Sequence, residues 1–437
     1  MKKDVKVGLL GFGTIGTGVV KLFHQNARLI EERLGAKITL SRIADLDVTT
    51  DRGVPVDSGI LTTDADSLLT DPEIDLVIEL IGGYEPARTF VLKAIENGKH
   101  VVTANKALLA LHGRELIEAA TDKGVDIMYE AAVGGGIPVI SAIKENLSAN
   151  NFSSIFGILN GTCNYILSRM TNEGIDFSEV LRDAQAQGFA EADPTFDIEG
   201  IDAAHKLALL VSLCFGTRVE FDNIYTEGIT DISALDIQFA NHFGYKIKLM
   251  AIGKVGYDKV EARVHPTMIP LNYPLADVDG AFNAVRMVGD FVGPVMLYGL
   301  GAGMDATASA VMGDVVSIAR NLLSGATDRA PVMGYREEYV KDLSIMPIEE
   351  VVTQYYLRFA TVDKPGVLAK ISGILGENDI GIASMLQPER QESGAVPIVL
   401  MTHDAKEANI RAALAEIDEL DVVREKSRFI RIESELE

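Results

Sequence analysis

Apolar residues recur along the first third of the chain in the two patterns that distinguish strands from helices. Short apolar runs bounded by turn residues are typical of buried strands, and apolar positions spaced three or four apart are typical of helices. The strands predicted in this way are 5–10, 37–44, 75–81, 99–103 and 125–129, and the helices are 17–33 and 85–97. This alternation predicts a parallel, doubly wound sheet of the Rossmann kind.

The rest of the chain divides at breaks in this pattern. From residue 151 onward a helix at 201–215 and strand-like segments at 246–255 and 259–264 predict an α+β domain. A helix predicted at 306–323 follows a glycine cluster, and we expect it to pack back onto the first domain. The segment from 351 has the order β-α-β-β-α-β of a ferredoxin-like fold. The predicted domains are 1–135 (completed by about 304–325), 136–303, and 351–437 after a linker at 326–350.

Composition narrows the class of protein. A chain of 437 residues is too long for one core, and its net charge of −23 argues against nucleic-acid binding, which requires basic surface. Cys163 and Cys214 lie far apart in apolar contexts, which indicates buried thiols in a reducing compartment. No apolar stretch approaches the ~20 residues that span a bilayer. We therefore expect a cytoplasmic protein that binds neither membrane nor nucleic acid.

A glycine-rich loop joins the first predicted strand to the first helix. Glycines in this pattern allow a tight turn and a close approach of the backbone to a pyrophosphate, and the helix N-terminus favours its negative charge. The loop therefore predicts a dinucleotide site, formed by Gly11, Phe12, Gly13, Thr14, Ile15 and Gly16.

The ends of two later strands carry polar residues suited to the same site. Asp45 ends the second strand, where a carboxylate accepts hydrogen bonds from the adenosine ribose and repels a 2′-phosphate. Arg42 and Arg52 lie close in sequence and suit a 2′-phosphate instead, so NAD and NADP both stay open. Thr103 and Lys106 follow another strand, where ligands of parallel sheets collect, although Asn-Lys is also ordinary helix-start chemistry.

The stretch GFAEADPTFDIEGIDAAHKLALL, residues 188–210, is rich in carboxylates just before and inside an apolar helix. Asp202 and Lys206 are four residues apart and so share one helix face. One interpretation is an exposed ion pair that contributes a few tenths of a kcal/mol. The other is catalytic, because reduction of an aldehyde by hydride needs a proton donor for the developing alkoxide, and a lysine held by a carboxylate supplies one.

Four motifs in order resemble the homoserine dehydrogenase family: TANKALLA, EAAVGGGIPV, LNGTCNYIL and the long acidic stretch. The resemblance covers about residues 5–325. It implies NAD- or NADP-dependent interconversion of L-homoserine and L-aspartate 4-semialdehyde, in the biosynthesis of threonine, methionine and isoleucine. Because no aspartate kinase region precedes Val5, we expect a monofunctional enzyme.

The resemblance also implies roles for particular residues. Lys206 corresponds to the proton donor, and Asp202 belongs to the polar network that positions substrate and lysine. Glu191 corresponds to the residue that binds the substrate ammonium group, and Asp197 belongs with it among the substrate-binding residues. Lys106 matches a lysine near both substrate and nicotinamide, so which of the two lysines dominates proton transfer stays open.

Two further sites follow from the resemblance. Glu130 and the backbone carbonyls of Val133, Gly135 and Ile137 match a structural site for a monovalent cation, sodium by preference. Gly303 is expected near the cofactor. At this point the chain departs from the family, because Asp305 stands in a loop where the family more often has glycine and a nearby proline.

The C-terminal segment DKPGVL, residues 363–368, resembles the ACT family of amino-acid-binding regulatory modules. A proline and a glycine at a strand-to-helix turn expose backbone N–H groups that suit a ligand carboxylate. The resemblance implies feedback control by threonine, or a module that only assembles subunits. We expect a homodimer or homotetramer.

Two other functions compete with this interpretation. A related semialdehyde dehydrogenase that acylates its substrate would need a reactive thiol at Cys163. A nucleotide- and amino-acid-binding sensor without turnover would have lost a catalytic lysine, whereas Lys106 and Lys206 are both present.

Overall fold

The computed structural model describes residues 4–387 and 396–434, which form two compact units. The first unit contains Met1–Gly161, Ala204–Asp222 and Phe282–Leu343. The second contains Thr162–Ala203, Asn223–Ala281 and Ser344–Glu437. In the described part of the chain, no helix is long and apolar enough to cross a membrane.

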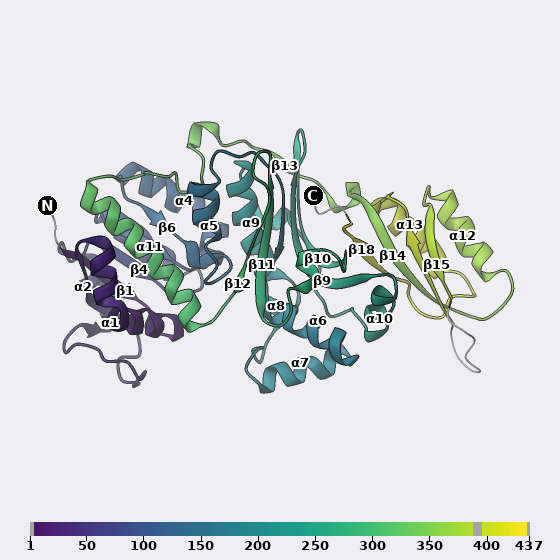
Figure 1. The fold of residues 1–437 in the computed structure, drawn as a ribbon, viewed down its shortest axis with the longest axis horizontal. Coiled ribbons are helices and arrows are strands. Elements are labelled where there is room, and N and C mark those ends of the chain that lie inside the picture. The colour runs from purple at the N-terminus through teal and green to yellow at the C-terminus, as the bar shows by residue number, and fades with distance from the viewer. Residues whose placement is uncertain (1–3, 388–395, 435–437) are drawn as a thin grey trace. The chain divides into compact units, whose positions relative to one another are not determined.

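The first unit begins with a parallel six-stranded sheet, drawn in purple and blue in Figure 1. Its strands in spatial order are β3 (Leu61–Thr62), β2 (Lys37–Ala44), β1 (Asp4–Leu10), β4 (Leu76–Glu79), β5 (His100–Thr103) and β6 (Ile127–Met128). Strands β4 and β5 are buried at every position, which explains the apolar residues at their centres. The order 3-2-1-4-5-6 confirms the predicted Rossmann fold, whose ligands bind where the strand order reverses, beside β1 and β4.

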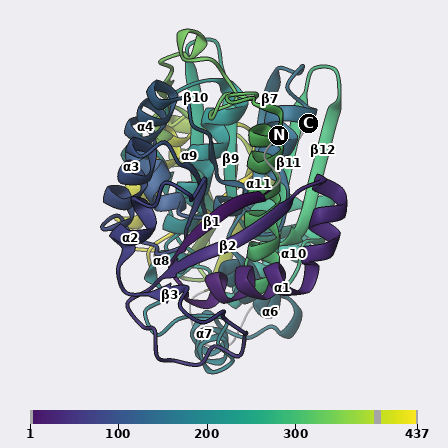
Figure 2. The ribbon, with the colours of Figure 1, turned by 90° about the vertical axis from the view of Figure 1, so that its left-hand side faces the viewer.

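Helices cover both faces of this sheet. Figure 2 shows α1 (Thr14–Leu34) and α11 (Met304–Ser324) on one side of the strands and α3 (Ala87–Glu96) and α4 (Lys106–Lys123) on the other. A Cβ at Gly18 would lie 2.8 Å from Met304 and 3.0 Å from Ala308, so this glycine permits α1 and α11 to pack closely. Residues 304–324 thus lie against a helix of the first sheet. A short helix, α2 (Ala65–Leu69), precedes β4.

Three antiparallel strands form a second sheet region in the first unit. The strand β11 (Phe282–Gly289) pairs with β12 (Gly293–Leu300) on one side and with β7 (Phe152–Ile158) on the other. The short helix α5 (Val139–Ser141) precedes them. The helix α9 (Ile201–Phe215) has the predicted bounds, and the division between the units falls within its first turn.

The second unit contains a long antiparallel pair, β9 (Tyr245–Val255) and β10 (Lys259–Pro270). Two short strands, β8 (Tyr225–Thr226) and β13 (Ser344–Ile345), pair in parallel with β10. The helices of this region are α6 (Gly161–Glu173), α7 (Phe177–Ala186), α8 (Thr195–Ile198) and α10 (Ala234–His242).

The C-terminal part of the second unit has the predicted ferredoxin-like order. Its elements are β14 (Val352–Thr361), α12 (Val367–Glu377), β15 (Ile382–Leu386), β16 (Val396–Thr402), β17 (Ala405–Lys406), α13 (Glu407–Asp418) and β18 (Arg428–Ile432). The sheet order is β18-β14-β16-β15, and the two helices share a buried core with the strands. The strand β18 also pairs with β10, so the C-terminal module is joined to the rest of its unit by backbone hydrogen bonds.

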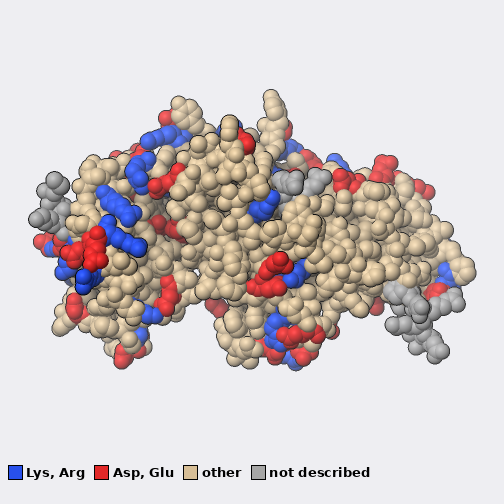
Figure 3. All heavy atoms as spheres, in the orientation of Figure 1, with Lys and Arg blue, Asp and Glu red and all other residues tan. Residues whose placement is uncertain are grey.

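The surface carries charges of both signs. On the face drawn in Figure 3, acidic side chains lie beside basic ones rather than in a separate region. The net charge of −23 is therefore not gathered into one acidic patch on that face.

Candidate active site

The glycine loop has the geometry of a dinucleotide cradle. Gly11 has a φ of +92°, and a Cβ there would lie 2.7 Å from the Leu80 carbonyl oxygen. A Cβ at Gly16 would lie 2.2 Å from the Gly11 carbonyl oxygen, whereas Gly13 faces open space. Gly13 begins α1 without a side-chain cap, so the N–H groups of Thr14, Ile15 and Gly16 start a helix whose positive end suits an anion. These residues fit a pyrophosphate.

Asp45 lies at the end of β2 and contacts the glycine loop. Its Oδ2 accepts a hydrogen bond from the Phe12 N–H at 2.5 Å, and its Oδ1 accepts one from the Asp47 N–H at 2.8 Å. The Arg52 guanidinium lies 4.7 Å from the centre of the Phe12 ring and 3.6 Å from Asp45. Arg42 instead binds Ser67 and lies 3.6 Å from Asp71. Of the two arginines considered for a 2′-phosphate, Arg52 is the one beside Asp45.

A buried polar cluster joins the carboxyl ends of β4 and β5. The Thr103 hydroxyl donates to Glu79 at 2.6 Å, and the other oxygen of Glu79 accepts from the Ile81 N–H at 2.8 Å. Thr103 also accepts from the Asn105 N–H, and Asn105 caps α4 by accepting from the Leu108 N–H. Lys106 is the first residue of this helix. The Asn105 cap explains why α4 starts here. The hydrogen bonds among Glu79, Thr103 and Asn105 hold the backbone just before Lys106.

Lys206 and Asp202 lie four residues apart on α9, and both are buried, with 8% and 5% of their surface exposed. The Lys206 ammonium donates a hydrogen bond to the Leu159 carbonyl oxygen at 2.7 Å. An exposed ion pair is therefore the wrong interpretation of this spacing. Burying an ammonium group costs free energy, and a functional role is a common reason for such a lysine.

The acidic loop before α9 is held by the first turn of α6. The Thr162 hydroxyl donates to Asp197 Oδ2 at 2.9 Å, and the Cys163 thiol donates to the Asp197 carbonyl oxygen at 3.1 Å. Asp197 is therefore partly engaged within the protein. Glu191, in the same loop, has an exposed side chain.

Both cysteines are buried free thiols, as predicted. Burial raises the pKa of Cys214, and the Cys163 thiol is fully buried. Neither has the exposed, electropositive surroundings that a reactive thiolate requires. This disfavours the acylating semialdehyde dehydrogenase.

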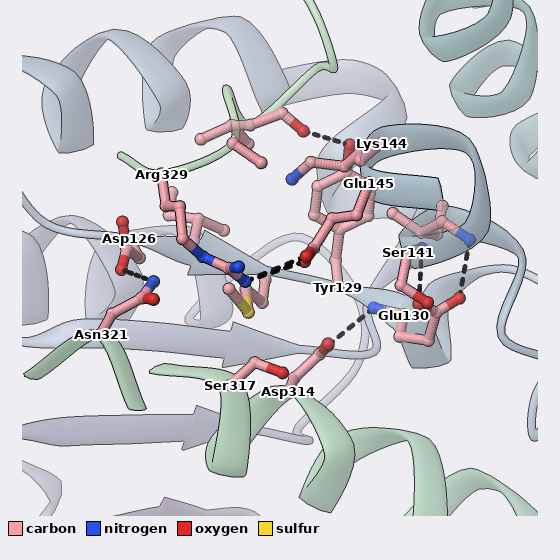
Figure 4. A pocket seen from close by; sticks show the side chains of 15 residues that line it. Asp126, Tyr129, Glu130, Ser141, Lys144, Glu145, Asp314, Ser317, Asn321 and Arg329 are labelled. Carbon is pink, nitrogen blue, oxygen red and sulfur yellow. Dashed lines mark hydrogen bonds and ion pairs between the residues drawn. The ribbon is translucent and has the colours of Figure 1, made fainter. Parts of the chain in front are cut away.

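A small polar cavity of about 40 Å³ lies beside Glu130, between α5 and α11 (Figure 4). The two carboxylate oxygens of Glu130 accept the N–H groups of Ile140 at 2.7 Å and Ser141 at 2.8 Å. Asp314 accepts the Glu130 N–H at 2.7 Å. Burial raises the pKa of Glu130 and raises the pKa of Asp314 to about 8, and it lowers the pKa of Lys144.

The donor set expected for a cation combines one carboxylate with backbone carbonyls. Glu130 is buried, and its two carboxylate oxygens already accept the N–H groups of Ile140 and Ser141. The Ile137 carbonyl already accepts the Val139 N–H at 2.8 Å. In the described residues no group of three or more His, Cys, Asp or Glu side chains could hold a metal ion, so a site here would depend on the carbonyls of Val133, Gly135 and Ile137.

Gly303 immediately precedes α11 and has a φ of +115°. Next in the helix, Asp305 forms an ion pair with Lys21 of α1, with contacts of 2.8 and 2.9 Å. Asp305, at which this chain departs from the family, therefore has an ionic partner, Lys21, on the helix that follows the glycine loop.

The candidate effector loop lies at the start of α12 in the C-terminal module. Gly366 precedes the helix with a φ of +89°, a conformation that L side chains rarely adopt. No side chain caps this helix start. The predicted strand-to-helix turn is confirmed, with its backbone N–H groups at an exposed loop.

The structure thus brings the glycine loop, Asp45 and Thr103 to one edge of the first sheet. Sequence reasoning missed Glu79 and Thr162. Glu79 lies in the apolar run DLVIELI. The sign that it could have a role was that it is a single carboxylate near the end of a predicted buried strand. Thr162 stood in the quoted motif LNGTCNYIL, but its partner Asp197 is 35 residues away.

Comparison with known proteins agrees with these features. Family models match the homoserine dehydrogenase NAD-binding domain over residues 11–130, homoserine dehydrogenase over 138–316 and the ACT domain over 355–422. A homoserine dehydrogenase of Pseudomonas aeruginosa is 47% identical over 435 residues, with 99% of each chain covered. One of Neisseria gonorrhoeae is 43% identical over 432 residues, again with 99% of each chain covered.

Solved structures are similar over the same length. The crystal structure of a homoserine dehydrogenase from Thiobacillus denitrificans matches with a TM-score of 0.93 and 47% identity, over 99% of each chain. A hyperthermophilic archaeal homoserine dehydrogenase in complex with NADPH matches with a TM-score of 0.63 and 25% identity, over 75% of this chain and 100% of that one. The chain therefore belongs to the homoserine dehydrogenase family, as an oxidoreductase that acts on a CH–OH group and has an NAD(P)-binding domain and a C-terminal ACT domain.

Proposed function

We propose that this protein interconverts L-homoserine and L-aspartate 4-semialdehyde with Lys206 as the proton donor, in threonine, methionine and isoleucine biosynthesis. The observation that carries the assignment of Lys206 is its burial on α9 with its ammonium held by the Leu159 carbonyl at 2.7 Å. A lysine fixed in this way is pre-oriented for one proton transfer.

The nicotinamide cofactor, when bound, supplies or accepts the hydride at C4 of the substrate. In the reductive direction Lys206 gives a proton to the carbonyl oxygen as it becomes an alkoxide, and in the oxidative direction it accepts the hydroxyl proton. Its positive charge also stabilises the oxygen while negative charge develops there. The protein thus contributes orientation and electrostatics, while the hydride belongs to the cofactor.

The other site residues bind and orient. Glu191 pairs with the substrate ammonium group, and its exposed carboxylate supports this because it is not committed to a buried partner. Asp197 and Asp202 hold the polar network around the substrate. Lys106, which begins α4 after the Thr103–Asn105 cluster, binds near both the substrate and the nicotinamide.

The cofactor is held by the glycine loop, with Asp45, Thr103 and Gly303 beside it. The open space at Gly13 and the uncapped start of α1 support this. Arg52 favours NADP and Asp45 favours NAD, so either cofactor fits. A sodium ion at Glu130 and the carbonyls of Val133, Gly135 and Ile137 would have a structural role, and the burial of Glu130 supports it.

We further propose that threonine binds the ACT domain and inhibits the enzyme, and that the protein is a cytoplasmic homodimer or homotetramer. The uncapped start of α12 after Gly366 supports an amino-acid carboxylate at that loop.

The test is to follow homoserine-dependent reduction of NAD and of NADP by their ultraviolet absorbance, with and without threonine. Turnover with homoserine that threonine lowers is the expected result. Glu191→Gln should raise the KM for homoserine by about 10-fold or more, because a charge-assisted hydrogen bond is lost. The matched control is Glu179→Gln, an exposed glutamate of α7. Absence of turnover with both cofactors in both directions would contradict the proposed activity, and turnover indifferent to threonine would contradict only the proposed regulation.

A further inference from the structure

Arg431 is the largest fully buried side chain described in the protein, and it belongs to β18, the last strand of the ACT domain. Its strand pairs with β14 of the ACT sheet and, through Thr267↔Arg431, with β10. Arg431 therefore lies where the regulatory domain is joined to the rest of the second unit.

Arg431 binds carboxylates on both sides of this junction. It forms a bidentate pair with Glu407 at the start of α13, with contacts of 2.6 and 2.7 Å. Its remaining nitrogen, Nη1, donates to Glu227 at 2.9 Å, and Nη2 also donates to the Tyr225 hydroxyl at 3.2 Å. Glu407 belongs to the ACT domain, whereas Tyr225 and Glu227 belong to the segment that includes β8.

The segment that Arg431 binds is packed against the acidic loop. The Ile229 N–H donates to the Ile198 carbonyl at 2.9 Å, and Ile198 is the last residue of α8. A Cβ at Gly228 would lie 2.4 Å from the Ile198 carbonyl oxygen and 2.7 Å from Glu199, so the two backbones are in close contact. Asp197 immediately precedes this contact in the chain, and Asp202 follows it in α9.

A second set of buried contacts holds β18 in place. Glu433 follows β18 and accepts from Lys254 of β9 at 2.7 Å and from Arg263 of β10 at 3.0 Å. Arg263 also contacts His265 Nε2 at 2.7 Å. Arg431 is thereby fixed against β9 and β10 on one side and against α13 on the other, which leaves its contact with Glu227 little freedom.

We propose that Arg431 is a positioning residue for the homoserine site, acting through Glu227 and the 228–229 backbone on the end of α8. The ACT domain in this view supplies part of the scaffold of the substrate site, in addition to any effector that it binds. The inference rests on the assignment of the loop and α9 residues Glu191, Asp197 and Asp202 to substrate binding.

The discriminating variant is Glu227→Gln in the full-length protein, because it removes the charge facing Arg431 while Glu407 still pairs with that arginine. We expect the KM for homoserine to rise about 5- to 10-fold, with kcat, the KM for the cofactor and the unfolding midpoint nearly unchanged, since one charge-assisted contact is weakened. Glu350→Gln is the control, because Glu350 is also paired with a cation on β10, Lys259 at 2.6 Å, at the exposed end of that strand and outside the contacts around Arg431.

Arg431→Lys tests whether the effect passes through the arginine. The double variant should have a KM for homoserine no higher than that of the more affected single variant, because both substitutions weaken the contact between Arg431 and Glu227. An unchanged KM in Glu227→Gln, or equal losses of kcat, cofactor affinity and thermal stability, would overturn the inference. A wild-type protein that does not oxidise homoserine would instead contradict the proposed function.

Discussion

The carboxylate of Asp45 accepts a hydrogen bond from the backbone N–H of Phe12 at 2.5 Å, joining the end of β2 to the glycine loop. Because the second oxygen of Asp45 also accepts a backbone N–H, the carboxylate is oriented by the protein itself. Arg52 lies beside it over the Phe12 ring. Two side chains of opposite charge thus lie beside the glycine loop.

Arg52→Gln should weaken binding of NADP far more than binding of NAD. Loss of a charged partner for the 2′-phosphate should raise the KM for NADP about 10-fold or more and change the KM for NAD by about 2-fold at most. Steady-state kinetics with both cofactors measure this. Arg42→Gln is the matched control, since Arg42 binds Ser67 and Asp71 instead. An equal rise for both cofactors would show that Arg52 does not distinguish them.

Lys248→Met should destabilise the protein strongly. The buried Lys248 ammonium donates to Asn164 at 3.0 Å, to the Val278 carbonyl at 2.5 Å and to Asp279 at 3.0 Å. Removing it takes away the lysine that donates to the Asn164 side-chain oxygen and a charged partner of Asp279, and we expect a loss of about 3 kcal/mol in the free energy of unfolding. Lys246→Met removes the neighbouring partner of Asp279 and should cost about 1 kcal/mol. Denaturant unfolding compares the two, and equal losses would contradict the account.

Asp314→Asn should stabilise the protein at alkaline pH. Burial raises the pKa of Asp314 from 3.8 to about 8, so between these values the unfolded state is ionised while the folded state stays protonated. The unfolding free energy contributed by this group therefore falls as pH rises from about 4 to about 8 and stays low above that. The variant lacks this loss, and its unfolding midpoint should exceed that of the wild type most clearly near pH 9.

The difference between Asp314→Asn and wild type should shrink toward zero near pH 4, where both side chains are neutral. Ser317→Ala, on the same helix and the same cavity, is the control and should show no such pH dependence. A stability difference that does not vary with pH would mean that Asp314 is ionised in the folded protein.

Much of the fold could be predicted because the long helices and strands bury one or both faces, and a buried face gives a regular pattern of apolar residues. The strand 37–44 and the helix 201–215 have the predicted bounds. The strand β12 could not be assigned, because it mixes exposed and partly buried positions and exposes Tyr298 and Leu300. A strand without a consistent buried face gives no clear alternation.

Part of the site was predictable from motifs and part depended on tertiary contacts. The glycine loop and Asp45 carry local signals, and the structure places them together. That Arg52 rather than Arg42 lies beside Asp45 depends on the direction in which each side chain extends, which the sequence does not give. The hold of Thr162 on Asp197 joins residues 35 apart, so spacing alone did not reveal it.

Lys206→Met, assayed separately for homoserine binding and for turnover, tests whether Lys206 moves the proton. We predict that homoserine binding in the presence of cofactor, measured by calorimetry, changes by about 3-fold or less. Turnover should fall about 100-fold or more, as expected for loss of a general acid. Turnover close to wild type, or a loss explained entirely by weaker homoserine binding, would show that Lys206 is not the proton donor.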